Sequence, residues 1–173
     1  MNKGAAMTTR GGAGIFAARN WNVAANRGER NLLKKYRSTS ELLAEINSLL
    51  TSSKASPDHS PLDDVIEALC RGRHYTWAGI YLAVENDPAR QLLGSGSDLH
   101  PGTALPETRT KVVVSIKLAG RELGVLDVES DQENAFGAED RVLLEKVAHA
   151  LALFLVGPGK YITRKARQAA LAR

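Results

Sequence analysis

The chain has 173 residues, 43% hydrophobic and 24% charged, which is enough for one folded domain with terminal extensions. A single cysteine, Cys70, excludes a disulfide framework within a monomer and fits a reducing compartment, so we expect the protein in the cytoplasm. No apolar run approaches the roughly 18 residues that a membrane span requires, so we expect no membrane partner.

The net charge of +4 is divided unevenly along the chain. Residues 1–37 hold eight basic residues and one acidic residue, a net charge of +7. Residues 38–157 hold ten basic and eighteen acidic residues, a net charge of −8, and residues 158–173 hold five basic residues and no acid. We therefore expect a basic, mostly disordered N-terminal arm at 1–37, a folded domain at 38–157 and a basic C-terminal tail at 158–173. The arm also has the composition of a transit peptide.

Two helices are expected before the first strand. Ser38 and Glu41 form a capping-box signature that starts one helix. Ser60 at the N-cap and Pro61 at the first helical position start the next, which ends in a basic run around Arg73. The apolar residues of the first helix that fall on one side are Leu42, Leu43, Ile46, Leu49 and Leu50.

Four strands are expected at 77–84, 91–96, 110–118 and 122–130, followed by a closing helix from Glu139 to the Gly157-Pro158-Gly159 stop. Helices before and after an antiparallel sheet predict an α+β fold, with a sheet of about four strands and helices packed on one face. The apolar stripe of the closing helix comprises Leu143, Leu144, Val147, Ala148, Leu151, Phe154 and Leu155.

Alternation along the strands divides their side chains between two faces. One set is nearly all aliphatic and is expected to pack on the helices. To keep that set matched between strands, we predict a three-residue hairpin loop, Gly120-Arg121-Glu122. This register places Ser115 opposite Asp127, with Lys117 diagonal to it.

Two segments resemble the GAF domain, a small-molecule sensing and dimerising module. The matching residues are the GVLDVES strand at 124–130, Phe136 with Glu139 and Asp140, the apolar closing helix and the WAGIYL strand at 77–82. The family places several tens of residues that roof its ligand pocket before the third strand of this chain. Only residues 98–109 occupy that place here, so the resemblance implies a shortened domain with a reduced or absent pocket.

The second sheet face holds the candidate ligand site. Aromatic walls with a few oriented polar groups are what a small ligand needs. The alternative is a wet face or a surface covered by another chain, and the arm, through Ile15, Phe16 and Trp21, is a further candidate roof. The candidate ligand-binding residues are Trp77, Tyr81, Ser115, Lys117, Asp127 and Glu129.

No catalytic or metal constellation is found, and no cofactor is expected. The resemblance includes the free methionine-(R)-sulfoxide reductases, whose cysteines lie on the segment shortened here, and the chain has no second cysteine to resolve a sulfenic acid. Cys70 is expected to be a small buried hydrophobe. The four histidines lack metal-ligand spacing.

We therefore expect a non-catalytic regulatory or signalling module. The resemblance implies a homodimer through the helices at 41–50 and 142–155, with Leu43 and Leu50 available for the interface, and an unidentified small metabolite or protein as partner. One alternative is a nucleic-acid-associated protein that binds through its basic tails. The other is a degenerate relative of the free methionine-(R)-sulfoxide reductases.

Overall fold

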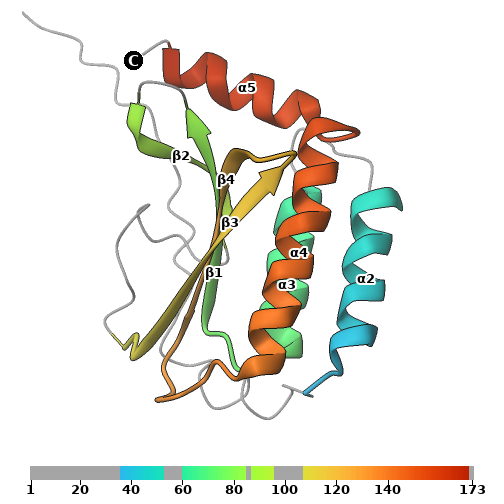
Figure 1. Cartoon of the computed structure of the whole chain (residues 1–173), viewed down its shortest axis with the longest axis vertical. Helices are drawn as coiled ribbons and strands as arrows, with labels where there is room; N and C mark the ends of the chain where they lie inside the picture. Colours follow the sequence, from blue (N-terminus) through green and yellow to red (C-terminus); the bar gives the residue numbers. More distant parts are fainter. Residues whose placement is uncertain (1–35, 53–59, 85–86, 96–106, 172–173) are drawn as a thin grey trace, which may run out of the picture. The chain divides into compact units, whose positions relative to one another are not determined.

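A computed structural model of the chain describes residues 36–52, 60–84, 87–95 and 107–171. The predicted N-terminal arm up to residue 35, including its candidate roof residues, and most of the shortened middle segment lie outside these ranges. In chain order (Figure 1) the elements are α2 (Thr39–Ser52), α3 (Pro61–Gly72), β1 (Trp77–Val84), β2 (Asp87–Ser95), β3 (Thr110–Leu118), β4 (Arg121–Ser130), α4 (Ala138–Val156) and α5 (Lys160–Leu171).

The four strands form one antiparallel sheet in the order β2-β1-β4-β3. Helices α3 and α4 pack on one face of this sheet, and α2 packs on α3 and α4 rather than on the strands (Figure 1). The α+β prediction is therefore confirmed, because the sheet has a helix-covered inner face and a second, outer face. We use these two names below.

The predicted helix starts are present in atomic detail. The Ser38 backbone N–H donates to the Glu41 carboxylate over 3.1 Å, and the Glu41 N–H donates to the Ser38 hydroxyl over 3.3 Å, so the capping box closes in both directions. At α3, the Ser60 hydroxyl accepts from the Leu62 N–H, and Pro61 occupies the first helical position. These caps supply partners for amides that have none within the helix.

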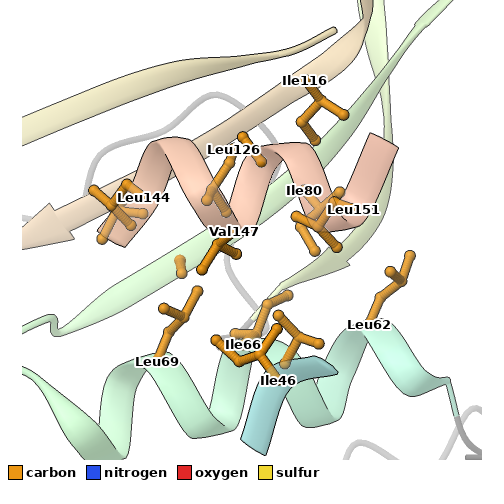
Figure 2. Close-up of a cluster of buried hydrophobic side chains, with 14 of the residues drawn as sticks. Ile46, Leu62, Ile66, Leu69, Ile80, Ile116, Leu126, Leu144, Val147 and Leu151 are labelled. Atoms are coloured by element: carbon orange, nitrogen blue, oxygen red, sulfur yellow. The ribbon is translucent and has the colours of Figure 1, made fainter. Parts of the chain in front are cut away.

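The core lies between the inner sheet face and the helices (Figure 2). It confirms the aliphatic set predicted from strand alternation, and every residue of the predicted α4 stripe is buried in it. Leu50, predicted to be left over for a dimer interface, is instead buried in the core, and Leu43 is partly buried against it. The homodimer itself stays a prediction. The buried side chains labelled in Figure 2 are Ile46, Leu62, Ile66, Leu69, Ile80, Ile116, Leu126, Leu144, Val147 and Leu151.

The predicted three-residue loop of the β3–β4 hairpin is wrong. Leu118 pairs with Arg121 across a two-residue turn of Ala119 and Gly120, whose φ angles are 49° and 79°. Two consecutive positive φ angles are typical of the type I′ turn that matches strand twist. A bulge at Leu123 then shifts the register, so the aliphatic faces still match although the loop is shorter than predicted.

The second strand also begins earlier than predicted, at Asp87 rather than at residue 91. Pro88 therefore lies inside β2, where the sequence pattern suggested a connection. The sheet order places β2 at an edge, and edge strands tolerate proline because one side of the strand needs no donor.

The predicted basic tail contains a packed helix. Helix α5 contacts β1, β2 and α4, and its Ile162 packs against the core. The chain bends by 79° between α4 and α5. At the end of α4, the Gly157 N–H donates to the Leu153 and Phe154 carbonyls. No single helix within the described ranges is long and apolar enough to cross a membrane; only α4 and α5 taken together, across this bend, have a sufficient length and composition.

Candidate functional site

The outer sheet face brings three rows of side chains together across β1, β4 and β3. In the first row Trp77 pairs with Glu129, and Glu129 with Lys111. The other rows, read in the same direction, are Gly79, Asp127 and Val113, and then Tyr81, Val125 and Ser115. Acidic groups therefore lie on the central strand, between the aromatic strand β1 and the strand that carries Lys111.

The aromatic part of the outer face is closely packed. The rings of Trp77 and Tyr81 lie 6.4 Å apart, and with Val125 they form a small apolar cluster separate from the main core. A Cβ on Gly79 would lie 2.4 Å from the Trp77 ring and 3.1 Å from the Tyr81 ring, so the indole occupies the space of the missing side chain. Trp77 is 4% exposed and Tyr81 6%, which makes this surface buried rather than open.

Lys111 joins the two acids of β4. Its ammonium lies 2.6 Å from Asp127 Oδ2 and 3.3 Å from Glu129 Oε1. The other Glu129 oxygen accepts a 2.6 Å hydrogen bond from the Thr108 hydroxyl. Both oxygens of the buried Glu129 carboxylate are therefore engaged within the protein, as burial of a charged group requires.

The acids also fix the protonation state of Lys111. Burial alone would lower the pKa of Lys111, since it penalises the charged ammonium. Hydrogen bonds to Asp127 and Glu129 and their negative charges outweigh burial, so the pKa of Lys111 lies above its ordinary value of 10.5. The side chain therefore remains a cation across the neutral range.

The structure brings together four of the six predicted site residues: Trp77, Tyr81, Asp127 and Glu129. Ser115 instead pairs with Val125, and its hydroxyl donates to the Glu122 carboxylate. Lys117 is exposed and pairs with Glu122 rather than lying beside Asp127. Both errors have one cause, the hairpin register, which is displaced by two residues from the predicted one.

Sequence reasoning missed Lys111 and Thr108. The predicted register placed Lys111 beyond the end of the fourth strand, and Thr108 fell in the shortened middle segment. Lys111 nevertheless has the same parity as Ser115 and Lys117, that is, it lies an even number of residues from each of them along the strand. Strand alternation therefore marks it as an outer-face residue. A two-residue turn followed by a bulge would have placed it opposite Glu129.

Cys70 lies on the other side of the sheet from these acids. It is half-buried on α3, which packs on the inner face, and it is in contact with the main core. Within the described ranges no group of three or more His, Cys, Asp and Glu side chains is arranged to hold a metal ion. The outer face thus offers carboxylates and aromatic rings but lacks a thiol nucleophile near them.

A second buried polar cluster joins α2 and α4 to the loop between α3 and β1. Asp140 accepts a 2.8 Å hydrogen bond from the Tyr75 hydroxyl and caps α4 through the Gly137 N–H, while the Arg73 Nε lies 3.9 Å away. Burial raises the pKa of Tyr75, and its hydrogen bond to Asp140 adds to the shift, so the phenol remains a donor. Arg73 also donates to Thr39 on α2. These contacts connect α2, α4 and the loop between α3 and β1, which favours a structural role.

Comparison with known proteins reveals the fold. No protein-family model and no curated protein sequence matches the chain. Among solved structures, a GAF domain of an Acinetobacter phosphoenolpyruvate-protein phosphotransferase is 16% identical with a TM-score of 0.58, over 70% of this chain and 94% of that one. The free methionine-R-sulfoxide reductase of Neisseria meningitidis, in complex with its substrate, is 18% identical with a TM-score of 0.59, over 77% and 99% of the two chains.

The corresponding reductase of Staphylococcus aureus, also solved with substrate, is 17% identical with a TM-score of 0.56, over 70% of this chain and 97% of that one. These neighbours include both a GAF domain of a phosphotransferase and enzymes, so the likeness carries the architecture and not the activity. The order of elements, the helix-covered sheet and these neighbours agree that the chain has a GAF-like fold.

Proposed function

We propose that the chain is a non-catalytic regulatory module with a GAF-like fold that acts through protein contacts and self-association. The observation that carries this proposal is that the side chains of the outer face fill the space beside one another and pair with one another. The Trp77 ring fills the space at Gly79, and Lys111 holds both Asp127 and Glu129. A small ligand would have to displace these internal contacts before it could use them.

The similarity to reductases does not alter this proposal. A sulfoxide reductase needs a thiol that attacks its substrate and a second group that resolves the product. The one cysteine of this chain, Cys70, is packed on the inner side of the sheet, whereas Asp127 and Glu129 lie on the outer side. The acids are therefore separated from the thiol by the sheet itself.

The outward face of α4 supports self-association. Its apolar residues Val142, Leu153 and Val156 are 45%, 50% and 47% exposed. With Lys146 and His149 they recur at alternating intervals of four and three residues, which is the spacing of a helix–helix seam. A second copy of the chain presents the same seam, so a two-fold pairing of α4 helices would cover it.

The test of the closed outer face is ligand-induced stabilisation, measured in a Trp21→Phe background so that Trp77 is the only tryptophan. Nucleotides, cyclic nucleotides, amino acids and methionine sulfoxide are each titrated while fluorescence follows thermal unfolding. We expect no compound to raise the unfolding midpoint by binding at this face.

The matched variants are Asp127→Asn in β4 and Asp131→Asn just beyond it, since Asp131 is exposed. A compound that stabilises the parent and the Asp131→Asn protein, but not the Asp127→Asn protein, would establish a working pocket and overturn the proposal. Turnover of free methionine-R-sulfoxide that is lost in Cys70→Ser would also contradict it.

A further inference from the structure

A cavity of about 190 Å³ lies on the inner side of the sheet, at the bend between α4 and α5. Four elements contribute to it: the later part of β1, the start of β4, the end of α4 and the first two turns of α5. Its lining residues are Leu82, Arg121, Leu123, Leu155, Val156, Lys160, Thr163 and Arg167. It is separate from the outer face that carries Asp127 and Trp77.

The polar part of this lining is cationic. Arg121, Lys160 and Arg167 line the cavity together with the Thr163 hydroxyl, and none of the described residues that line it is acidic. Lys160, Thr163 and Arg167 are spaced by three and four residues, which brings them onto one face of α5. In the described part of the chain, neither Lys160 nor Arg167 forms an ion pair with a carboxylate.

The position of Lys160 is unfavourable for the fold by itself. Lys160 is the first residue of α5, where the helix dipole disfavours a cation. An anion in the cavity would offset this cost.

The remaining walls of the cavity are apolar. Leu82, Leu123 and Leu155 are buried side chains of three different elements. A site with apolar walls and a few convergent charged groups selects a ligand that has an apolar part and a part of opposite charge. The volume is below the 300–1,000 Å³ or so that is usual for drug-sized ligands, so the ligand must be small.

We propose that this cavity binds a small organic anion, a phosphate or carboxylate group carried on a short apolar chain. Lys160 and Arg167 hold the anionic group, and the leucine walls receive the apolar part. Because Lys160 begins α5 and Leu155 is close to the end of α4, bound ligand would stabilise the bend between the two helices.

Calorimetric titration of the full chain with butyl phosphate, butanoate and inorganic phosphate, at constant ionic strength, tests the proposal. The informative variant is Lys160→Gln/Arg167→Gln, which removes two positive charges from the cavity. Its matched control is Arg164→Gln/Lys165→Gln, which removes the same charge from exposed positions of the same helix outside the lining.

We expect butyl phosphate or butanoate to bind more tightly than inorganic phosphate. The cavity variant should lose at least about tenfold in affinity, while the control retains wild-type binding. Equal losses in the two variants would indicate diffuse attraction to a basic helix and would overturn the proposal. It would also be overturned if no organic anion bound the wild-type protein, or if the apolar chain gave no advantage over inorganic phosphate.

Discussion

At the scale of single residues, the pairing of the buried acids on the outer face depends on Lys111. Alternation along the strands was sufficient to predict that Trp77, Tyr81, Asp127 and Glu129 share a face, because parity survives any even shift in register. It was not sufficient to choose between Lys111 and Lys117, since these two lysines have the same parity. Only the turn length and the bulge decide which of them faces the acids.

Replacement of Lys111 by Met should destabilise the protein at neutral pH. The change leaves the buried acids Asp127 and Glu129 without their ammonium partner. Breaking a fully buried pair costs 3–5 kcal/mol, and we expect about 1–3 kcal/mol here because the Lys111 side chain is 39% exposed. Urea unfolding followed by circular dichroism measures the difference.

The pH dependence gives this prediction a direction. The folded-state pKa of Lys111 is raised above its ordinary 10.5, so its contribution is complete below that value and is lost as the pH rises through the raised pKa. The gap in stability between wild type and Lys111→Met should therefore narrow in alkali above pH 10.5. Lys117→Met, the same change on the same strand, should cost less than about 0.5 kcal/mol. Equal costs for the two variants would contradict the assignment.

At the scale of elements, the helix caps were predictable and the hairpin was not. Ser38, Glu41 and Ser60 act within four residues of chain, so their effect is visible in the sequence. The turn at Ala119 and Gly120 depends on a balance between loop length and a bulge several residues away. A bulge restores the matched faces that a two-residue loop alone would break, and for this reason face matching favoured the wrong loop.

Ala119→Asn should stabilise the hairpin. Alanine at a φ of 49° bears the steric cost of the left-handed region, whereas asparagine followed by glycine is a preferred type I′ pair. We expect a gain of about 0.5–1 kcal/mol, seen as a higher urea midpoint with an unchanged slope. Ala119→Val should have the opposite effect, because β-branched residues are poorly suited to positive φ. Stabilisation by both substitutions would exclude this explanation.

At the scale of the whole molecule, the layer order was predictable but the packing of α5 was not. The amphipathic patterns of α2, α3 and α4 led directly to helices covering one sheet face. In α5 four of the twelve residues are basic and none is acidic, and the apolar contacts of Ile162 depend on the bend that precedes the helix. A basic segment without acidic residues therefore resembles a flexible tail until its neighbours in the fold are known.

Self-association is predicted to depend on the α4 seam. Val142→Lys/Leu153→Lys places ammonium groups on the exposed apolar positions, and two-fold symmetry would bring each of them into the interface twice. We expect the dimer dissociation constant, measured by sedimentation equilibrium, to rise at least about tenfold with no loss of folded structure.

The control for the seam is Val113→Lys, which alters a valine of similar exposure, 50%, on β3. Val113 pairs with Asp127, so a lysine there meets a compatible charge. This control should associate like the wild type. A wild-type protein that sediments as a monomer at high micromolar concentration, or a seam variant that remains dimeric, would exclude α4 as the interface.

The bend at Gly157-Pro158-Gly159 has a mechanical consequence. The Gly159 N–H bonds to the Phe154 carbonyl, and a Cβ on Gly159 would lie 2.4 Å from the Phe154 ring, so the corner is locked against the end of α4. A straight helix transmits twist along its axis as a rigid rod, but a 79° corner converts that twist into sideways displacement of the next segment. Rotation of α4 about its own axis would therefore displace α5 sideways across β1 and β2 instead of rotating α5 about its own axis.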